Sequence, residues 1–266
     1  MKMQKDDWQR LWQGALALSV FILIWYTASI TGLFGRVPRD YSLLLLPPPG
    51  KILVTIFETL VSGYLLKHVL ISLARVGLGF TIAVAIGVPL GLAMALVPLV
   101  NNLVEPFVRI FGPIPGIAWV PLAILWFGLG DKAAIFIITM GSVFPVLINT
   151  YQGMKDVDQT LIEAARTMGA GPWQLLSRVI LPSLIPYLVT GFRVGLGFAW
   201  RVVIAAEMVG VPNGLGYMLG VGRGTGRTDI TIITMVVLGA IMLVVEELIF
   251  APLERRTRFW RRSVRI

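Results

Sequence analysis

Six stretches of this chain are each long and apolar enough to cross a lipid bilayer. A helix needs about 20 mostly apolar residues to span a hydrocarbon core that is about 30 Å thick. Backbone groups in lipid must find their hydrogen bonds within the protein, and long helices provide them. We therefore predict an all-α polytopic membrane protein with six transmembrane helices, at residues 11–31, 69–97, 103–127, 133–150, 184–209 and 230–253.

The composition agrees with a membrane protein and excludes several kinds of site. Only 14% of the residues are charged, against about 25% in soluble domains. The sequence contains no cysteine, and His68 is its one histidine. Disulfides, thiolate metal sites and pairs of histidine ligands are thereby excluded. We predict no catalytic residue and no metal site, so a membrane enzyme is the least favoured class.

The distribution of Lys and Arg predicts the orientation in the membrane. If the N-terminus is cytoplasmic, twelve of these residues fall on the cytoplasmic side and seven on the other, and the cytoplasmic side normally carries the excess. Both termini are therefore expected in the cytoplasm, with the basic tail at 254–266 beside anionic lipid rather than nucleic acid. The apolar run at 11–31 is longer than the core of a signal peptide, which favours a signal anchor that stays in place.

A short helix is predicted at 51–61, after the proline run that ends at Gly50. Apolar residues recur there at helical spacing, and Lys51 and Glu58 lie on the opposite side. This pattern is typical of a helix in the outer interface of the membrane, although a surface loop with incidental periodicity is the alternative. Residues 1–67 are thus expected to hold the signal-anchor helix and this interfacial helix.

Glycine and proline occupy informative places within the spans. Small residues recur every four positions from Ala83 to Ala95, and again at Gly191 and Gly195, which favours close packing of helices. Proline and glycine interrupt the third span at 112–116. Irregular backbone inside a membrane must be covered by protein or line a water-filled cavity. This run is therefore either a helix break between neighbours or part of a pathway lining.

The loop after the fourth span contains the most specific signal in the chain. Asp158 is a suitable N-cap and Gly169 a suitable residue to end a short helix, and Pro172 suits the first turn of a second one. Small alanines at 164 and 165 would let the first helix fit deeply into a groove of another protein. An ordinary connector is the alternative. The loop reads Glu163-Ala164-Ala165-Arg166-Thr167-Met168-Gly169, then nine residues, then Val179-Ile180-Leu181-Pro182.

This spacing resembles the EAA motif of ABC importer permeases, in which Glu-Ala-Ala is followed by Gly and, nine residues later, by Ile-x-Leu-Pro. Val179 replaces the first isoleucine, and the other positions match. The stretches at 72–80, 109–127, 205–208 and 214–217 resemble the nitrate, taurine, alkanesulfonate and bicarbonate branch of these permeases. The likeness covers residues 65–255.

The resemblance implies a type I importer fold, in which one N-terminal helix precedes a five-helix core at 68–253 with a coupling loop at 151–183. It also implies a permease homodimer, two cytoplasmic ATP-binding subunits and an extracytoplasmic solute-binding protein. ATP and Mg would bind to the partner subunits, because this chain has no G-x-x-x-x-G-K-[ST] phosphate-binding loop. The residues expected to contact the ATPase are Glu163, Ala164, Ala165, Gly169, Leu181 and Pro182.

Ionisable groups within the spans are candidates for a translocation pathway, because they are costly in lipid. Arg201 is the best candidate to meet an anion. For Arg109, Arg193 and Glu207 a place at the membrane interface is an equal alternative, and Arg75 is expected to be structural. The glycine-rich stretch at 214–226 is expected to be an outer loop that meets the binding protein. The pathway residues expected are Arg109, Pro115, Trp119, Trp200, Arg201 and Glu207.

The function that follows is the non-catalytic permease subunit of an ATP-driven importer in a bacterial inner membrane. It would carry a small anion, with taurine or an alkanesulfonate favoured and nitrate or bicarbonate close behind. The alternative is a secondary transporter or channel that uses a gradient. That class would show an inverted repeat or paired carboxylates within its spans, and the only adjacent acids in a span are Glu246 and Glu247, near its inner end.

Overall fold

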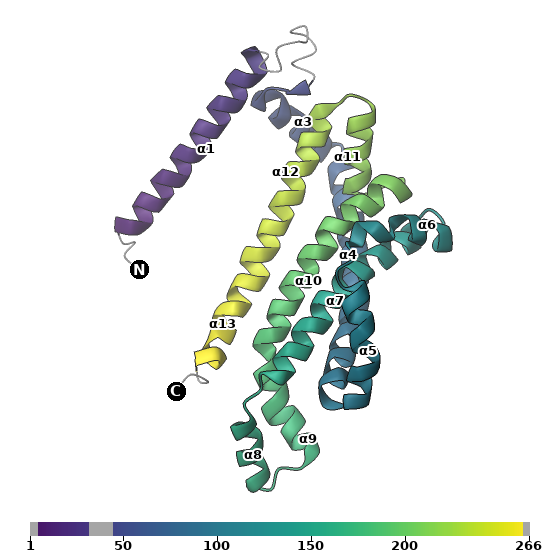
Figure 1. Cartoon of the computed structure of the whole chain (residues 1–266). Helices are drawn as coiled ribbons and strands as arrows, with labels where there is room; N and C mark the ends of the chain where they lie inside the picture. Colours follow the sequence, from purple (N-terminus) through teal and green to yellow (C-terminus); the bar gives the residue numbers. More distant parts are fainter. Residues whose placement is uncertain (1–4, 32–44, 263–266) are drawn as a thin grey trace. The chain divides into compact units, whose positions relative to one another are not determined.

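The computed structural model describes residues 5–31 and 45–262, which fold into helices joined by short turns (Figure 1). No strand occurs within these ranges. The chain divides into two compact units. The first contains Met1–Lys67 and Met218–Val237, and the second contains His68–Tyr217 and Leu238–Ile266.

The first unit contains α1 (Lys5–Thr31) and α3 (Pro49–Val61). The indole Nε1 of Trp25 donates to the carbonyl of Pro47 at 3.1 Å, and the Ser29 hydroxyl donates to the carbonyl of Leu46 at 2.6 Å. These bonds fasten the end of α1 to the segment that leads into α3. Proline at the first position of α3 lacks only an N–H that would have no helical partner. The predicted helix at 51–61 is thus confirmed as α3.

The second unit holds most of the long helices, and three of its helices extend into the first unit. Its elements, in chain order, are α4 (Tyr64–Leu96), α5 (Pro98–Phe111), η1 (Gly116–Trp119), α6 (Val120–Phe127), α7 (Asp131–Lys155), α8 (Gln159–Thr167), α9 (Pro172–Leu175), η2 (Leu176–Ile180), α10 (Leu181–Gly210), α11 (Leu215–Gly224), α12 (Thr228–Val245), η3 (Glu246–Phe250) and α13 (Ala251–Arg262). Both η2 and η3 are π-helical turns, each continuous with its neighbours.

Helix α7 lies at the centre of this unit and packs along α10. Small residues permit the close approach. A Cβ atom at Gly91 of α4 would lie 2.8 Å from the carbonyl oxygen of Leu147, and one at Gly191 of α10 would lie 2.8 Å from Cβ of Asn149. The sequence pattern of small residues therefore serves helix packing, as predicted.

Five of the described helices are long and apolar enough to cross a membrane, and a sixth span results if one bent pair is counted. The pair is α5 with the segment Gly116–Phe127, and it bends by 93° at a short break. The third span, predicted at 103–127, is therefore broken, which was one of the two alternatives for its interruption at 112–116. The break falls at Gly112-Pro113-Ile114-Pro115, where proline removes backbone donors and clashes with the preceding turn.

The glycine-rich stretch at 214–226 is not the loop that was predicted, because most of it forms α11. Its glycines provide space for neighbours: a Cβ atom at Gly216 would lie 2.4 Å from the carbonyl oxygen of Ile204. At the other end of the chain, α13 continues through the predicted basic tail as far as Arg262. Residues 263–266 of that tail lie outside the described residues.

Candidate functional site

The loop between α7 and α10 forms a helical hairpin, defined here as residues 158–175, which lies beyond the ends of those helices (Figure 1). The carboxylate of Asp158 accepts a hydrogen bond from the backbone N–H of Thr160 at 2.8 Å and so caps α8. Hydrogen bonds from Thr160 hold the pKa of this carboxyl below its usual value. The predicted N-cap at Asp158 is thus confirmed, and so is the predicted start of a second helix, because Pro172 is the first residue of α9.

The end of α8 requires glycine. Gly169 has φ +83, a left-handed conformation that residues with a Cβ atom adopt at a cost. Its N–H donates to the carbonyl of Arg166 at 2.9 Å, and the N–H of Ala170 donates to the carbonyl of Ala165 at 3.0 Å. These bonds satisfy carbonyl groups at the end of the helix and turn the chain toward α9.

The hairpin has a small apolar core, formed by its residues Ile162, Ala165 and Leu175 together with Val157, which immediately precedes it. Ala165 therefore packs inside the hairpin rather than at the groove of a partner, where it was expected together with Ala164. The reason is helical geometry. Ile162 and Ala165 are three residues apart and share a face, whereas Ala164 points about 100° away from Ala165. Glu163 and Ala164 remain exposed, as a partner would require.

Large apolar side chains project from the hairpin into solvent. Met168 is 81% exposed, Trp173 is 75% exposed, and Leu161 is exposed as well. Leu161, Ala164 and Met168 follow one another at helical spacing along one side of α8. Sequence reasoning centred on the motif missed Met168 and Trp173, although their place in a polar loop is itself a signal. Exposed apolar groups of this size, gathered in one place, mark an interaction surface.

The hairpin returns to the span through the π-helical turn η2 rather than through a break. Leu181 and Pro182 are the first residues of α10, and Leu181 is partly exposed. Pro182 removes one backbone donor inside this continuous helix, next to the π-helical turn η2. The hairpin and α10 thus form one continuous helical path from Pro172 to Gly210.

The predicted pathway residues Pro115 and Trp119 lie at the bend of the third span. Pro115 precedes η1, and a Cβ atom at Gly116 would lie 2.5 Å from Cγ2 of Val202, so η1 is pressed against α10. The ring of Trp119 lies 6.0 Å from that of Phe111. Its indole Nε1 is buried and has no hydrogen-bond partner within the described residues. An unpaired buried N–H is costly, so this donor is free to bind an acceptor oxygen.

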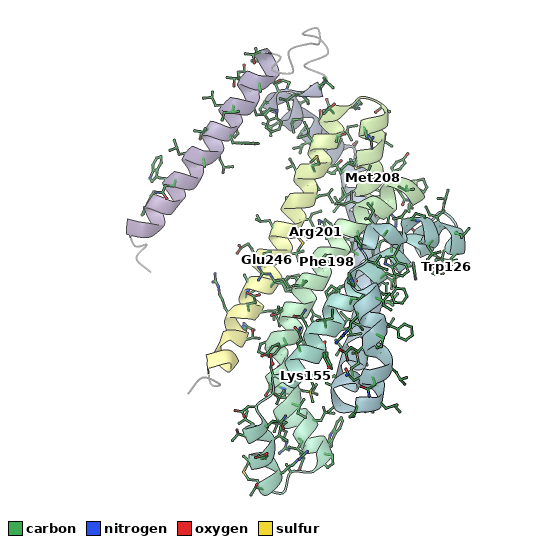
Figure 2. All side chains as sticks on the ribbon, in the orientation of Figure 1. Trp126, Lys155, Phe198, Arg201, Met208 and Glu246 are labelled. Atoms are coloured by element: carbon green, nitrogen blue, oxygen red, sulfur yellow. The ribbon has the colours of Figure 1, made fainter. Side chains whose placement is uncertain are left out.

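The two arginines of the predicted pathway have different surroundings. Arg109 is 77% exposed on α5 and pairs with Glu105 one turn earlier at 2.6 Å. Arg201 is exposed on α10, where its guanidinium lies 5.8 Å from the centre of the Phe198 ring (Figure 2). Arg201 forms no ion pair with any residue that the structure describes. Its charge therefore remains available to an anion.

Trp200 and Glu207 do not line a pathway in this structure. Trp200 is buried, and its indole N–H donates to the carbonyl of Leu238 at 3.1 Å, which joins α10 to α12. Glu207 is 0% exposed, and its carboxylate lies 2.7 Å from Nη1 of Arg75 on α4. Both residues face the helix-packing side of α10, so the prediction for them is wrong.

Further donors complete the surroundings of Glu207. The Ser72 hydroxyl donates at 2.8 Å, and the backbone N–H of Gly216 donates to Oε2 at 2.9 Å. Arg75 in turn donates from Nε to Asp131 at 2.8 Å and from Nη1 to the carbonyl of Asn213 at 2.9 Å. One buried carboxylate thus joins α4, α10 and the start of α11 through three kinds of donor.

The turn before α11 is held by the same cluster. The N–H of Gly214 donates to Nδ1 of His68 at 2.8 Å, and the N–H of Leu215 donates to Oγ of Ser72 at 2.8 Å. His68 stacks on Tyr217 with ring centres 5.9 Å apart. Ser72 and His68 were not recognised in the sequence, because their partners lie more than 130 positions away. The structural role expected for Arg75 is consistent with this arrangement.

A second ion-pair group lies on the same helix. Arg193 of α10 pairs with Glu254 of α13 at 2.6 Å and also with Glu246, the first residue of the π-helical turn η3. These side chains are partly exposed. Arg193 therefore joins α10 to the end of the last span instead of facing a pathway.

Comparison with known families decides what kind of protein has this arrangement. The family model for the binding-protein-dependent transport system inner membrane component matches residues 87–258, which include α7, the hairpin and α10. The chain belongs to this family. It is a permease subunit of an ABC importer and a multi-pass protein of the inner membrane, in agreement with the resemblance seen in the sequence.

The permease is similar to three proteins with named substrates. TauC, the taurine transport system permease protein of Escherichia coli (strain K12), is 33% identical over 93% of this chain and 89% of TauC. SsuC of Bacillus subtilis (strain 168), named provisionally as an aliphatic sulfonates transport permease, is 33% identical over 94% of this chain and 88% of SsuC. CmpB, the bicarbonate transport system permease protein of Synechocystis sp. (strain PCC 6803), is 32% identical over 71% of this chain and 68% of CmpB.

A solved structure confirms the predicted fold class. A chain of the MetNI methionine ABC transporter in an inward-facing conformation matches the permease with a TM-score of 0.59 and 25% identity. The match covers 74% of the permease and 95% of that chain. The permease therefore has the fold of a type I ABC importer.

Proposed function

We propose that the permease works with cytoplasmic ATPase subunits, and that the hairpin at 158–175 is the element they grip. The observation that carries this proposal is the surface of the hairpin, where Leu161, Met168 and Trp173 are exposed next to Glu163 and Ala164. Burying such side chains against a partner is favourable, because each removes a large apolar area from water.

The hairpin is suited to transmit force because it is stiff and continuous with two spans. Its own core holds α8 against α9, the α7 helix precedes it, and η2 joins it to α10 without a break. A displacement of the hairpin would therefore move α7 and α10 together. Coupling to ATP also requires that the hairpin bind the two states of the ATPase with different free energies.

The orientation and assembly belong to the same proposal. The excess of Lys and Arg on one side favours both termini and the hairpin in the cytoplasm. One hairpin per chain and two ATP-binding subunits favour a symmetric pair of permeases. An extracytoplasmic solute-binding protein, implied by the family, would deliver the cargo to the opposite face.

For the cargo we favour an organic sulfonate such as taurine. Two of the three relatives described above are named for taurine or aliphatic sulfonates, and their similarity covers more of the chain than that of the bicarbonate relative. The residues that would meet a sulfonate are Arg201 and Trp119, one a cation without an ion pair and the other an indole donor without a partner. Arg109 and Pro115 lie in the same bent span as Trp119.

The test is reconstitution of the permease in vesicles with its ATPase subunits and its solute-binding protein. Taurine, an alkanesulfonate, nitrate and bicarbonate are supplied in turn, and stimulated ATP hydrolysis and uptake are measured. We expect a response to the sulfonates, and a loss of uptake in Arg201→Gln at limiting substrate with assembly unchanged. A response to bicarbonate or nitrate alone would contradict the substrate assignment, and uptake without an ATPase partner would contradict the coupling.

A further inference from the structure

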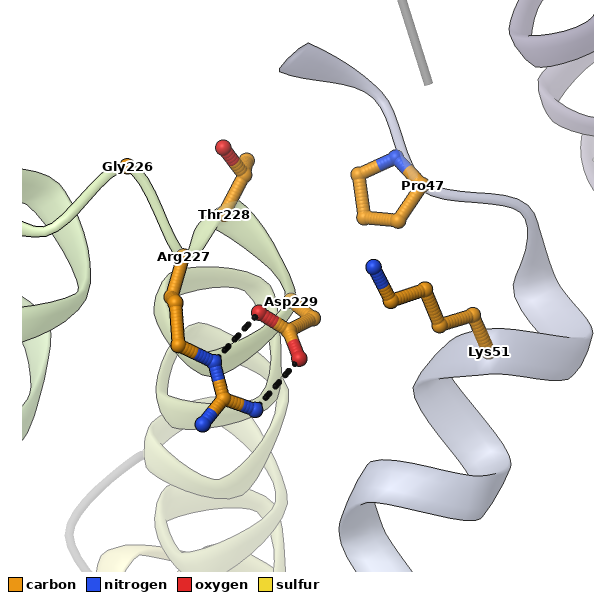
Figure 3. A pocket seen from close by; sticks show the side chains of 6 residues that line it. All are labelled: Pro47, Lys51, Gly226, Arg227, Thr228 and Asp229. Atoms are coloured by element: carbon orange, nitrogen blue, oxygen red, sulfur yellow. Dashed lines mark hydrogen bonds and ion pairs between the residues drawn. The ribbon is translucent and has the colours of Figure 1, made fainter. Parts of the chain in front are cut away.

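The first unit contains a small cavity between α3 and the start of α12 (Figure 3). Its volume is about 120 Å³, which is roughly the space of four water molecules in the liquid. Lys51 reaches toward it from α3, opposite Asp229. The lining residues are Pro47, Lys51, Gly226, Arg227, Thr228 and Asp229.

The charged groups that line this cavity are Lys51, Arg227 and Asp229, and Glu58 of α3 lies close enough to Arg227 to act on its charge. Asp229 is buried and pairs with Arg227 at 2.8 Å, while the Thr55 hydroxyl donates to the same carboxylate at 3.2 Å. The hydrogen bond to Asp229 raises the pKa of Arg227 above its ordinary value. Lys51 has no ion pair with any residue in the described ranges. The cavity therefore presents the ammonium group of Lys51 and one side of a guanidinium to whatever enters it.

The cavity lies where a membrane span begins. Thr228 is the first residue of the span Thr228–Thr257, and α3 precedes the span Tyr64–Leu96. The polar end of a span lies at the depth of the lipid headgroups. This placement holds for either orientation of the permease in the membrane.

Next to the cavity, α3 carries an apolar face whose large side chains are more than half exposed. Ile52 and Thr55 are buried on the other side of the helix. A helix with one free apolar face and a basic residue at its end is typical of binding at a membrane surface. The exposed apolar side chains are Leu53, Val54, Phe57, Leu60 and Val61.

We propose that this cavity binds the headgroup phosphate of an anionic phospholipid whose acyl chains lie along the apolar face of α3. The ammonium of Lys51 and the guanidinium of Arg227 attract the phosphate, and the Thr228 hydroxyl is at hand to donate a hydrogen bond to it. The cationic cavity and the apolar face of α3 lie side by side, so together they suit a ligand that has both a charged headgroup and apolar chains. A free oxyanion or an acidic side chain of a partner protein would leave the apolar face unused.

The experiment measures lipid retention by the full permease, purified together with its ATPase subunits. Native mass spectrometry follows titration with dioleoyl phosphatidylglycerol, and with dioleoyl phosphatidylcholine for comparison. The variant is Lys51→Gln, which leaves the Arg227–Asp229 pair intact. The matched control is Lys67→Gln, which removes an exposed lysine of the same unit outside the cavity.

We expect phosphatidylglycerol to bind about five-fold more weakly to Lys51→Gln, the usual effect of one basic residue beside anionic headgroups. Lys67→Gln should bind it as the unchanged permease does. Phe57→Ser should weaken the binding of both lipids, because it removes a large side chain from the apolar face of α3. Equal retention by Lys51→Gln and the unchanged permease, or equal losses in both lysine variants, would overturn the proposal.

Two further outcomes would assign the cavity to another ligand. If the permease retains neither lipid at this site but binds inorganic phosphate, and Lys51→Gln abolishes that binding, the cavity holds a free oxyanion. If Lys51→Gln keeps its lipid but loses stimulation by the solute-binding protein, the cavity receives an acidic group of that protein. Either result overturns the lipid site and leaves the coupling role of the hairpin untouched.

Discussion

Arg75 and Glu207 form a buried ion pair between α4 and α10, with Nη1 and Oε1 2.7 Å apart and both side chains closed off from solvent. Arg75 has a second carboxylate partner in Asp131, which is largely exposed. The two pairs share one guanidinium but differ in burial, and burial decides how much each contributes to stability.

Replacing Arg75 by Met should therefore destabilise the permease strongly. The change leaves the carboxylate of Glu207 buried without its charge partner, which costs about 3–5 kcal/mol. Asp131→Asn removes the exposed partner of the same arginine and should cost at most about 1 kcal/mol. Thermal unfolding of the purified protein in detergent measures both. Equal shifts of the unfolding midpoint would show that the buried pair is not the important one.

Gly169→Val should impair the hairpin while Gly171→Val does not. Gly169 has φ +83, where a Cβ atom costs about 1–2 kcal/mol. Gly171 lies two residues away with φ −72, and a Cβ atom there would meet nothing within 4 Å. We expect Gly169→Val to insert into the membrane normally but to retain less ATPase in a pull-down. Similar behaviour of the two variants would mean that the turn geometry is unimportant for the partner.

Met168→Ser and Trp173→Ser should weaken ATPase binding without affecting the fold. Each loses an exposed apolar side chain, and full burial of such a group contributes about 1.5–3 kcal/mol. Arg166→Gln is the control, because Arg166 lies on a different side of α8. The measurement is the affinity of the purified ATPase for the permease in vesicles. If Arg166→Gln has the larger effect, the partner contacts the other side of α8.

Trp119→Phe should reduce uptake at limiting substrate by roughly ten-fold or more, since a hydrogen bond to a charged group contributes about 1.5–3 kcal/mol. The substitution keeps an aromatic ring beside Phe111 and Phe136, removes the unpartnered donor and makes the ring smaller. Trp126→Phe, in the same group of rings, is the control. An unchanged concentration dependence of uptake in Trp119→Phe would remove the indole from the pathway.

Asp158 should make the hairpin sensitive to acid but not to mild changes of pH. Its pKa is lower in the folded chain than in the unfolded one because the charged form accepts hydrogen bonds from Thr160. The capping contribution is thus fully present above the unfolded pKa of about 3.9 and is lost as the pH falls through the lower, folded value. Helix α8 should keep its cap at neutral pH.

The matching substitutions separate the cap from the charge. Asp158→Asn should retain ATPase binding, because asparagine also caps helices, and Asp158→Ala should lose part of it. The pull-down used for Gly169 serves here as well. A greater loss in Asp158→Asn than in Asp158→Ala would show that the charge, not the cap, is required.

Local features of this protein were predictable from sequence, and distant pairings were not. The N-cap at Asp158 and the turn at Gly169 depend on a few neighbouring residues, so their residue types were sufficient. Hydropathy likewise located the spans, because length and apolarity are properties of one segment. A helix break at 112–116 was one of the two alternatives drawn from its proline and glycine residues, but the 93° angle was not predictable, because such residues mark a break without fixing its direction.

The candidate pathway shows the same division. Glu207 was assigned to it because an acid within a span is unusual, but its partner Arg75 lies 132 residues earlier in the chain. Nothing in the local sequence distinguishes a carboxylate that faces a cavity from one that neutralises a buried arginine. Only the packing of α4 against α10 decides between them. Arg201 differs because no described acid comes within reach of it.

The π-helical turn η2 lies between the hairpin and α10, so the number of residues in it sets the angle at which the hairpin leaves the axis of α10. Such a turn accommodates one residue more than an α-helical turn. Deleting a single residue from Leu176–Ile180 would return the segment to ordinary winding, and adding one would wind it further. Each change rotates the hairpin by roughly 100° about the axis of α10. The number of residues between Gly169 and Leu181 therefore sets the direction in which the permease presents its hairpin, and a length change there would misalign it even if every contact residue were kept.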